Sequence, residues 1–231
     1  MSPYPRYAIY YVPAAGDPLY RLGARALGYD GFSGNAIEFP TEITQRVTDW
    51  PEVTTDPRKY GFHATLKAPF ALAPGRTEAE LRKAFAGFAA PATSNIPFVV
   101  SSISSFIAVI PAAPSAELSG LAQACVEAFD AFRAPLTDHD RARRRPDRLT
   151  ARQLGYLDRW GYPYVAEEFR FHMTLTGSLP RQRHDTIVPL LRELFADITA
   201  TPRSIDRVAL FYQADAAARF RIIAEHDLGP C

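Results

Sequence analysis

Two stretches of this sequence carry the same five-residue pattern. Residues 60–70 read YGFHATLKAPF and residues 169–179 read FRFHMTLTGSL, so Phe-His-x-Thr-Leu occurs twice, with histidines at positions 63 and 172. A short motif arises easily by chance. Here, however, two of the five histidines in a chain of 231 residues also share their flanking residues. We therefore treat the two copies as a matched pair with one common task.

The two copies divide their side chains in the same way. Residues two apart on a β-strand point to the same face of the sheet. If both copies are strands, their polar faces carry Gly61, His63, Thr65 and Lys67 in the first copy and Arg170, His172, Thr174 and Thr176 in the second. The residues between them are apolar or small. A strand buried on both faces would be apolar on both, so the polar faces are expected to meet solvent or a cleft.

A groove between two such faces would suit a phosphate ester. A neutral imidazole can take a proton from water, while a protonated one can give a proton to the departing alkoxide. Hydroxyls and cations would bind the non-bridging oxygens and stabilise the transition state. The candidates for that role are Thr65, Thr174, Thr176, Lys67 and Arg170. This chemistry needs no metal ion and no other cofactor. The competing interpretation is a pair of ordinary strand histidines.

Composition limits the possible partners and the compartment. The net charge is +1, which gives no broad attraction to long nucleic acid or to an anionic membrane. The two cysteines, Cys125 and Cys231, do not suggest a disulfide framework, and the first residues lack the features of a signal peptide. The sequence therefore predicts a cytoplasmic protein with a small-molecule partner. It leaves the oligomeric state open.

The order of expected elements is similar in the two halves of the chain. Strands are expected at 7–12, 98–100, 107–110, 208–212 and 220–225, in addition to the two motifs, and helices at 19–27, 77–90, 115–132, 150–160 and 183–198. Each half then has a motif strand, a helix and two further strands. We expect one bilobal domain over residues 1–231, with lobes at about 55–112 and 166–228 joined by a helical segment at about 113–165.

With its two His-x-Thr motifs, the sequence resembles the 2H phosphoesterase superfamily, which includes RNA-ligase-like cyclic phosphodiesterases. RYAIYYVP, KYGFHATLKAPF and FRFHMTLTGSL are similar to the branch associated with phosphonate metabolism, often encoded beside carbon–phosphorus lyase genes. The resemblance runs from Tyr7 to about Leu228. It implies a bilobal, duplicated α+β fold with two antiparallel sheets lining a central cleft and helices outside.

The resemblance also implies a reaction, the opening or hydrolysis of cyclic phosphodiesters such as 2′,3′-cyclic nucleotides. By motif match, His63 and His172 are the catalytic acid and base, in an order left open, and Thr65 and Thr174 bind the phosphate. Lys67, Arg170 and Thr176 come only from the argument about strand faces. The expected function is a metal-independent phosphodiesterase acting on a small ribose or nucleotide cyclic phosphate. The alternatives are an RNA 2′,3′-end processing phosphodiesterase or ligase, and a non-catalytic sensor of a cyclic nucleotide or phosphosugar.

A basic run lies outside the motifs. It contains Arg141, Arg143, Arg144, Arg145 and Arg148 within eight residues. Charge blocks of this kind are usually hydrated loops. The sharper interpretation is a lid that reaches a second phosphate on the substrate, as in a bis-phosphorylated sugar. Both interpretations are open from the sequence.

Overall fold

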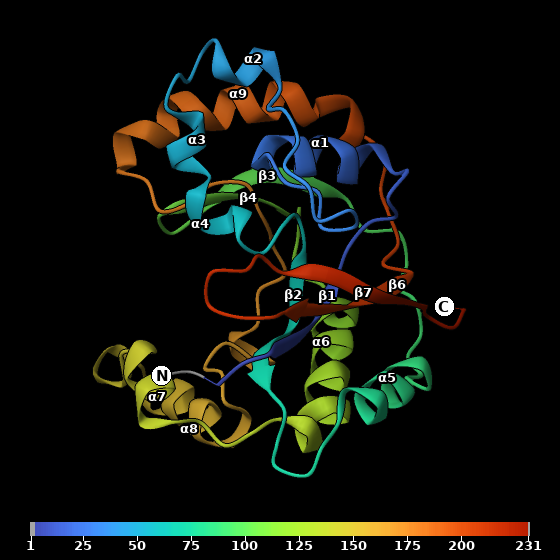
Figure 1. The fold of residues 1–231 in the computed structure, drawn as a ribbon. Helices are drawn as coiled ribbons and strands as arrows, with labels where there is room; N and C mark the ends of the chain where they lie inside the picture. Colours follow the sequence, from blue (N-terminus) through green and yellow to red (C-terminus); the bar gives the residue numbers. More distant parts are fainter. Residues whose placement is uncertain (1–2, 231) are drawn as a thin grey trace.

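Seven β-strands form one antiparallel sheet through the centre of the molecule (Figure 1). The computed structural model describes residues 3–230. Across the sheet the strands follow the order β3-β4-β5-β2-β1-β6-β7. Their bounds are β1 (Arg6–Tyr11), β2 (Ala64–Ala71), β3 (Phe98–Ile103), β4 (Phe106–Pro111), β5 (Met173–Thr174), β6 (Arg207–Gln213) and β7 (Arg221–Asp227).

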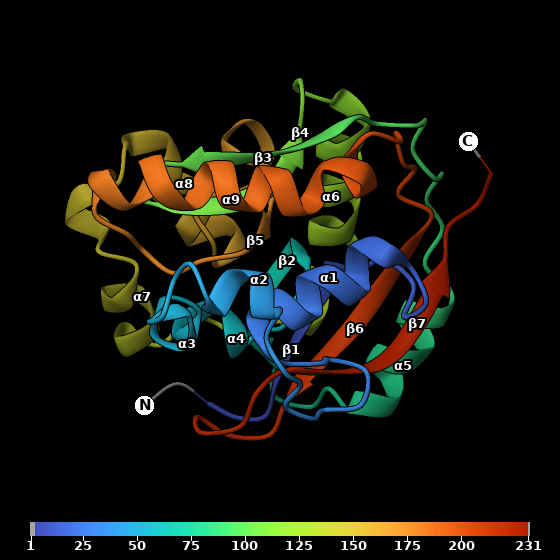
Figure 2. The same ribbon diagram turned by 90° about the horizontal axis from the view of Figure 1, so that it is seen from above.

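Helices cover the sheet on its outer sides (Figure 2). Helix α9 lies along β3 and β4, α6 lies against β2, and α5 lies beside β7. The longer helices are α1 (Pro18–Leu27), α5 (Glu78–Ala86), α6 (Ala116–Phe129), α8 (Ala151–Trp160) and α9 (Arg181–Thr199). The shorter ones are α2 (Thr41–Thr44), α3 (Trp50–Val53), α4 (Thr55–Arg58) and α7 (Asp138–Arg143), with 3-10 turns at η1 (Asp130–Phe132), η2 (Pro146–Arg148) and η3 (Ala166–Glu168). Among residues 3–230, no helix is both long enough and apolar enough to cross a lipid bilayer.

Local sequence signals explain where the main helices begin and end. Thr77 and Glu80 form the expected capping box at the start of α5, where each satisfies a backbone amide of the other. Ser115 caps α6, because its side chain accepts a hydrogen bond from the amide of Leu118. Gly28 ends α1 with a φ of 69°, a conformation that favours glycine. The five expected helices are all present, with ends shifted by a few residues.

The α+β class, the antiparallel pairing and the outer helices agree with the prediction, while the two expected sheets are joined into one. The junction is narrow, because β2 and β5 share a single residue pair, Ala64 with Met173. The strands of the two sequence halves are also interleaved. The second motif strand, β5, pairs with β4 from the first half, while β2 pairs with β1, next to β6. In the sheet, β5 from the range 166–228 therefore lies between β4 and β2, which both come from the range 55–112.

The segment 29–58 contains three short helices that carry the chain to the first motif. Trp50, at the start of α3, is fully buried, and its indole N–H donates to the carbonyl of Ala26 at 2.7 Å. Arg58, at the end of α4, donates from Nε to the carbonyl of Leu27 at 2.8 Å. These long-range bonds anchor α3 and α4 on the end of α1, just before residues 60–63.

Candidate active site

His63 is held by its own turn and by an aromatic neighbour. Gly61 adopts a φ of 75°, and its carbonyl accepts a hydrogen bond from Nδ1 of His63 at 2.9 Å. A carbonyl oxygen can only accept, so Nδ1 carries the proton, and a neutral ring presents the lone pair of Nε2. The ring stacks on Tyr10 of β1, with centroids 3.9 Å apart. The turn and the stacking therefore fix which nitrogen is available for chemistry.

His172 repeats this geometry in the second copy. Its Nδ1 donates to the carbonyl of Arg170, again two residues earlier, at 2.7 Å. The same argument leaves Nε2 of His172 as the free nitrogen. Phe106, at the start of β4, lies beside the ring, with centroids 5.4 Å apart. The two motifs thus set the same tautomer by the same local bond.

The strand register brings the two motifs together. Because Ala64 pairs with Met173 in an antiparallel ladder, the residues one step away in the same register are His63 opposite Thr174 and Thr65 opposite His172. Side chains directly opposite on neighbouring strands lie roughly 4.5–5.5 Å apart at Cβ. Each histidine is thus placed against the threonine of the other motif. A positive charge on His172 also lowers the pKa of His63, so the two rings interact electrostatically.

Burial shifts the proton affinity of both rings. It lowers the pKa of His63 to about 4, against the hydrogen bond to Gly61, which raises it. Burial also lowers the pKa of His172, opposed by the bond to the carbonyl of Arg170. Removing a cation from water disfavours the charged form, so burial favours the neutral form of both rings. An anionic substrate would raise both values, because it favours a nearby positive charge.

A cavity of about 400 Å³ opens beside the second histidine. Its wall combines polar and aromatic side chains from several elements. It is lined by Thr65, Leu66, Ile103, Ser104, Ser105, Phe106, Gln153, Tyr162, Tyr164, Val165, Glu168, Phe169, Arg170 and His172. A volume of this order fits a small organic ligand. We call this cavity the cleft; His172 lines it, and His63 adjoins it through Thr65.

Three of the other predicted residues are near the cleft. Thr65 lines it, and its hydroxyl lies 3.3 Å from Nε2 of His63. Thr174 is half-buried in β5, on the face of the two histidines by register. Arg170 is exposed at the cavity wall and forms no ion pair within residues 3–230. These three residues lie where a phosphate group in the cleft could reach them, whereas Lys67 and Thr176 do not.

Lys67 does not share the cleft, contrary to the prediction. Its side chain is only 3% exposed, and Nζ bonds to Asp130 at 3.0 Å and to the carbonyl of Val126 at 3.1 Å. The reason is a bulge in β2. One step along β1, from Ile9 to Tyr10, corresponds to two steps along β2, from Lys67 to Thr65. A bulge of this kind breaks the alternation of faces, so Lys67 turns into the protein beneath α6.

Thr176 is also wrongly assigned by the face argument. It is fully buried, accepts a hydrogen bond from the amide of Ile107 at 3.0 Å and donates to the carbonyl of Gly177 at 2.9 Å. The ladder ends before it, because the amides of Leu175 and Thr176 both donate to the carbonyl of Ile107. Thr176 therefore fastens the end of the short β5 strand and has no free hydroxyl for a ligand.

Several site residues were not found by sequence reasoning. Tyr10 supports His63, and Tyr162, Gln153 and Glu168 line the cavity from the segment after α7. Tyr10 lies in the RYAIYYVP stretch, but nothing in a single strand indicates which residue it will stack on. No group of three His, Cys, Asp or Glu side chains in the described part of the chain is arranged to hold a metal ion.

Comparison with known proteins identifies relatives along the whole chain. A family model described as "Protein of unknown function (DUF1045)" matches residues 65–221. The ribose 1,5-bisphosphate phosphokinase PhnN of Janthinobacterium sp. (strain Marseille) is 36% identical over 227 residues, covering 93% of this chain and 49% of that protein. The protein of the same name from Laribacter hongkongensis (strain HLHK9) is 32% identical over 222 residues, covering 94% and 50%. The chain thus spans about half the length of these curated relatives.

Solved structures with a similar course of the chain include LigT of E. coli and a protein described as a phosphoesterase. LigT of E. coli, in complex with 3′-AMP, has 13% identity and a TM-score of 0.41, covering 97% of this chain and 98% of its own. Another, described as a phosphoesterase, has 14% identity and a TM-score of 0.44, covering 96% and 97%. Nothing about activity follows from likeness at this level. From the family model and the two relatives above 30% identity, the chain belongs to the DUF1045 family of proteins of unknown function.

Proposed function

We propose that this protein is a metal-independent phosphodiesterase that hydrolyses a small cyclic phosphodiester. The observation that carries the proposal is the pair of imidazoles with the same tautomer, each in register with the threonine of the other motif. If both Nε2 atoms reach one phosphorus centre, the pair can act as general acid and general base.

His63 is the better candidate for the base and His172 for the acid. Burial lowers the pKa of His63 to about 4, so it stays neutral and can accept a proton when the substrate is bound. His172 lines the open cavity, where an anionic substrate directly raises its pKa and favours the protonated ring. The difference in surroundings therefore assigns different roles to two residues with the same local geometry.

The reaction balances with these two groups alone. A water molecule forms a new P–O bond while its proton moves to Nε2 of His63, and the P–O bond to one ring oxygen of the substrate breaks. The departing alkoxide takes the proton from Nε2 of His172 and becomes a hydroxyl. The product is a phosphate monoester, and solvent returns one proton from His63 to His172. The hydroxyls of Thr65 and Thr174, with Arg170, are proposed to bind the non-bridging oxygens during this step.

The names of the relatives suggest a substrate class. They refer to a kinase acting on a ribose with two phosphate groups. A phosphate-binding P-loop of the form G-x-x-x-x-G-K-S/T needs a Gly-Lys pair, and this sequence contains none. We therefore assign the kinase activity of those relatives to the half that this chain does not match. We infer that the present chain acts on a related ribose phosphate and opens a cyclic diester. The resemblance places this reaction in phosphonate metabolism.

A panel of cyclic phosphodiesters tests the proposal directly. Wild-type protein is incubated with 2′,3′-cyclic nucleotides and ribose 1,2-cyclic phosphate, with and without a chelator, and products are followed by phosphorus NMR. We expect turnover that the chelator does not change and that is lost in the His63→Ala/His172→Ala double variant. His226→Ala, which alters a histidine on β7 bonded to the carbonyl of Phe88, is the control. Binding without conversion at any pH would instead support the sensor alternative.

A further inference from the structure

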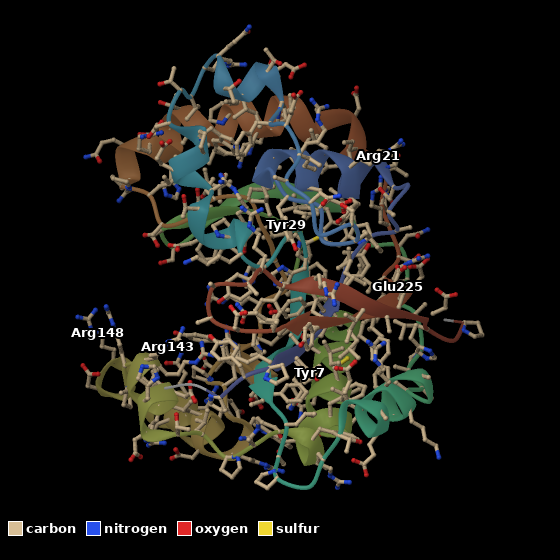
Figure 3. The ribbon with its side chains drawn as sticks, viewed as in Figure 1. Tyr7, Arg21, Tyr29, Arg143, Arg148 and Glu225 are labelled. Atoms are coloured by element: carbon tan, nitrogen blue, oxygen red, sulfur yellow. The ribbon has the colours of Figure 1, made fainter. Side chains whose placement is uncertain are left out.

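The basic run described above does not behave as one hydrated loop. Arg141, in α7, pairs with Asp158 of α8, and Arg148 is exposed and extends away from the ribbon (Figure 3). Arg144 lies against an aromatic ring, and its guanidinium carbon is 4.8 Å from the centroid of the Tyr162 ring. Because Tyr162 lines the cleft and Arg144 does not, this contact places one positive charge of the run behind the cleft wall.

Arg144 also lines a second cavity, together with an arginine from a distant part of the chain. Arg6, the first residue of β1, and Arg144 both line a cavity of about 90 Å³ between the start of β1 and α7. Arg133 and Arg143 line it too, although Arg133 is already paired with Asp130 at 2.8 Å. The carboxylate at this cavity is Asp140, whose Oδ2 accepts a hydrogen bond from Thr137. The lining therefore carries a clear excess of positive charge.

Neither Arg6 nor Arg144 is neutralised by the protein. Within residues 3–230 neither forms an ion pair with a carboxylate. The polar partner of Arg6 is the neutral amide oxygen of Gln213, which accepts from Nε at 2.9 Å and from Nη2 at 2.5 Å. Two guanidinium groups beside one small cavity repel each other, and a bound anion removes that cost. The guanidinium fork is well suited to phosphate oxygens.

This basic cavity is connected to the catalytic side of the molecule by two aromatic residues. Tyr162 separates it from the cleft, since Arg144 covers its ring and the ring lines the cleft. Tyr10 is buried and stacks on His63. Burial raises the pKa of Tyr10, and the charges of Arg6 and Arg144 both act against that increase, which shows that they are close to it.

We propose that Arg6 and Arg144 form a second anion subsite next to the cleft, and that the preferred cyclic phosphodiester carries an additional phosphate monoester that binds there. The inference rests on the proposed function and extends it, because it names a doubly phosphorylated substrate class. The reacting diester lies at His63 and His172, while the second phosphate occupies the subsite without taking part in bond cleavage. Selection then comes from a charge-assisted contact at a distance from the reacting phosphorus.

The test compares one cyclic diester with and without a second phosphate. Uridine 2′,3′-cyclic phosphate and its 5′-phosphorylated form are hydrolysed by wild type, Arg144→Gln and Arg148→Gln, after thermal melts have shown that the variants fold. Hydrogen bonds to charged groups contribute enough for a preference of about tenfold to hundredfold in kcat/KM for the 5′-phosphorylated form. We expect Arg144→Gln to reduce this ratio to near one and Arg148→Gln, the exposed control, to keep it. Equal ratios in all three proteins would overturn the proposal.

A binding measurement separates failure of the subsite from failure of the proposed activity. Ribose 5-phosphate and ribose are titrated calorimetrically into the His63→Ala/His172→Ala double variant, with and without Arg144→Gln. We expect binding of the phosphorylated sugar alone, weakened at high salt and lost with Arg144→Gln. If no cyclic diester is ever hydrolysed but this pattern is found, the subsite holds and the catalytic proposal fails. If ribose 5-phosphate does not bind, or binds equally after Arg144→Gln, the subsite is wrong.

Discussion

The two His-x-Thr copies are alike in local geometry and different in their surroundings. In both, Nδ1 donates to the carbonyl two residues earlier, at 2.9 Å for His63 and 2.7 Å for His172. His63, however, lies among aromatic rings, with Tyr10 stacked at 3.9 Å and Phe211 at 6.0 Å. His172 lines the open cavity, and its strand has only two residues, against eight for β2.

This comparison separates what a repeated motif determines from what its environment determines. The motif sets the tautomer, because the donor and the carbonyl acceptor lie in the same short segment. The environment sets the proton affinity, because that depends on desolvation and on charges contributed by other elements. A duplicated motif can therefore supply two nitrogens in the right place, while unequal packing makes one a better base and the other a better acid.

The largest expected effect comes from removing either imidazole. We expect His63→Ala and His172→Ala each to lower kcat/KM for a cyclic diester by about 10²–10⁴, the range for one lost proton transfer. An acyclic diester with a nitrophenyl leaving group, which departs without a proton, distinguishes the two roles. His172→Ala should recover most of its activity with that substrate, because the acid is no longer needed, whereas His63→Ala should not.

The contrary outcomes of this experiment are informative. Recovery of His63→Ala instead of His172→Ala would exchange the roles of base and acid. An equal response of both variants to the leaving group would contradict the claim that unequal burial assigns different functions to the two copies.

A smaller effect is expected from changing Thr65, two residues after the first histidine. Thr65→Val removes the hydroxyl that lies 3.3 Å from Nε2 of His63 but keeps the side-chain shape. We expect kcat/KM to fall about tenfold to hundredfold, as for loss of one hydrogen bond to a charged group. The matched control is Lys67→Met, which should lower the free energy of unfolding, because Lys67 is buried against Asp130. Its effect on KM for the diester should be small. If Lys67→Met strongly raises KM while Thr65→Val leaves kcat/KM unchanged, the two residues have been assigned to the wrong sides of the bulge in β2.

Local sequence signals predict the helix ends and part of the candidate site, but not Lys67 and Thr176. Ser115, Gly28 and the Thr77–Glu80 box act within one turn of chain, so the helix ends could be predicted from local signals. The alternation rule also holds from His63 to Thr65, and the register places Thr174 with them. It fails at Lys67 and Thr176, because a bulge in β2 and the early end of β5 depend on partner strands.

The other features that the sequence did not predict depend on partners far away in the chain. The buried acceptor of Lys67, Asp130, is 63 residues away, and no local pattern connects the two. The interleaving of β4 with β5 likewise depends on which edge of the sheet each strand joins, which the repeated element order does not specify. Residues that contribute through stacking or cavity lining, such as Tyr10 and Tyr162, are recognisable only after the strands are placed.

The third effect is on stability against acid rather than on the reaction, and it again distinguishes the two copies. The pKa of His63 is about 4 when folded, against about 6.5 for an unperturbed histidine. Between these values the unfolded state binds more protons, so the free energy of unfolding is higher above this window and falls as the pH drops through it. For His63 the loss is at most about 3 kcal/mol, since each pKa unit corresponds to about 1.4 kcal/mol.

His63→Asn should flatten this dependence, measured by urea unfolding across the window. His172→Asn should flatten it less, because burial shifts that ring less strongly. Equal slopes for the two variants would mean that the rings are equally desolvated, and the physical basis for giving them different roles would be lost.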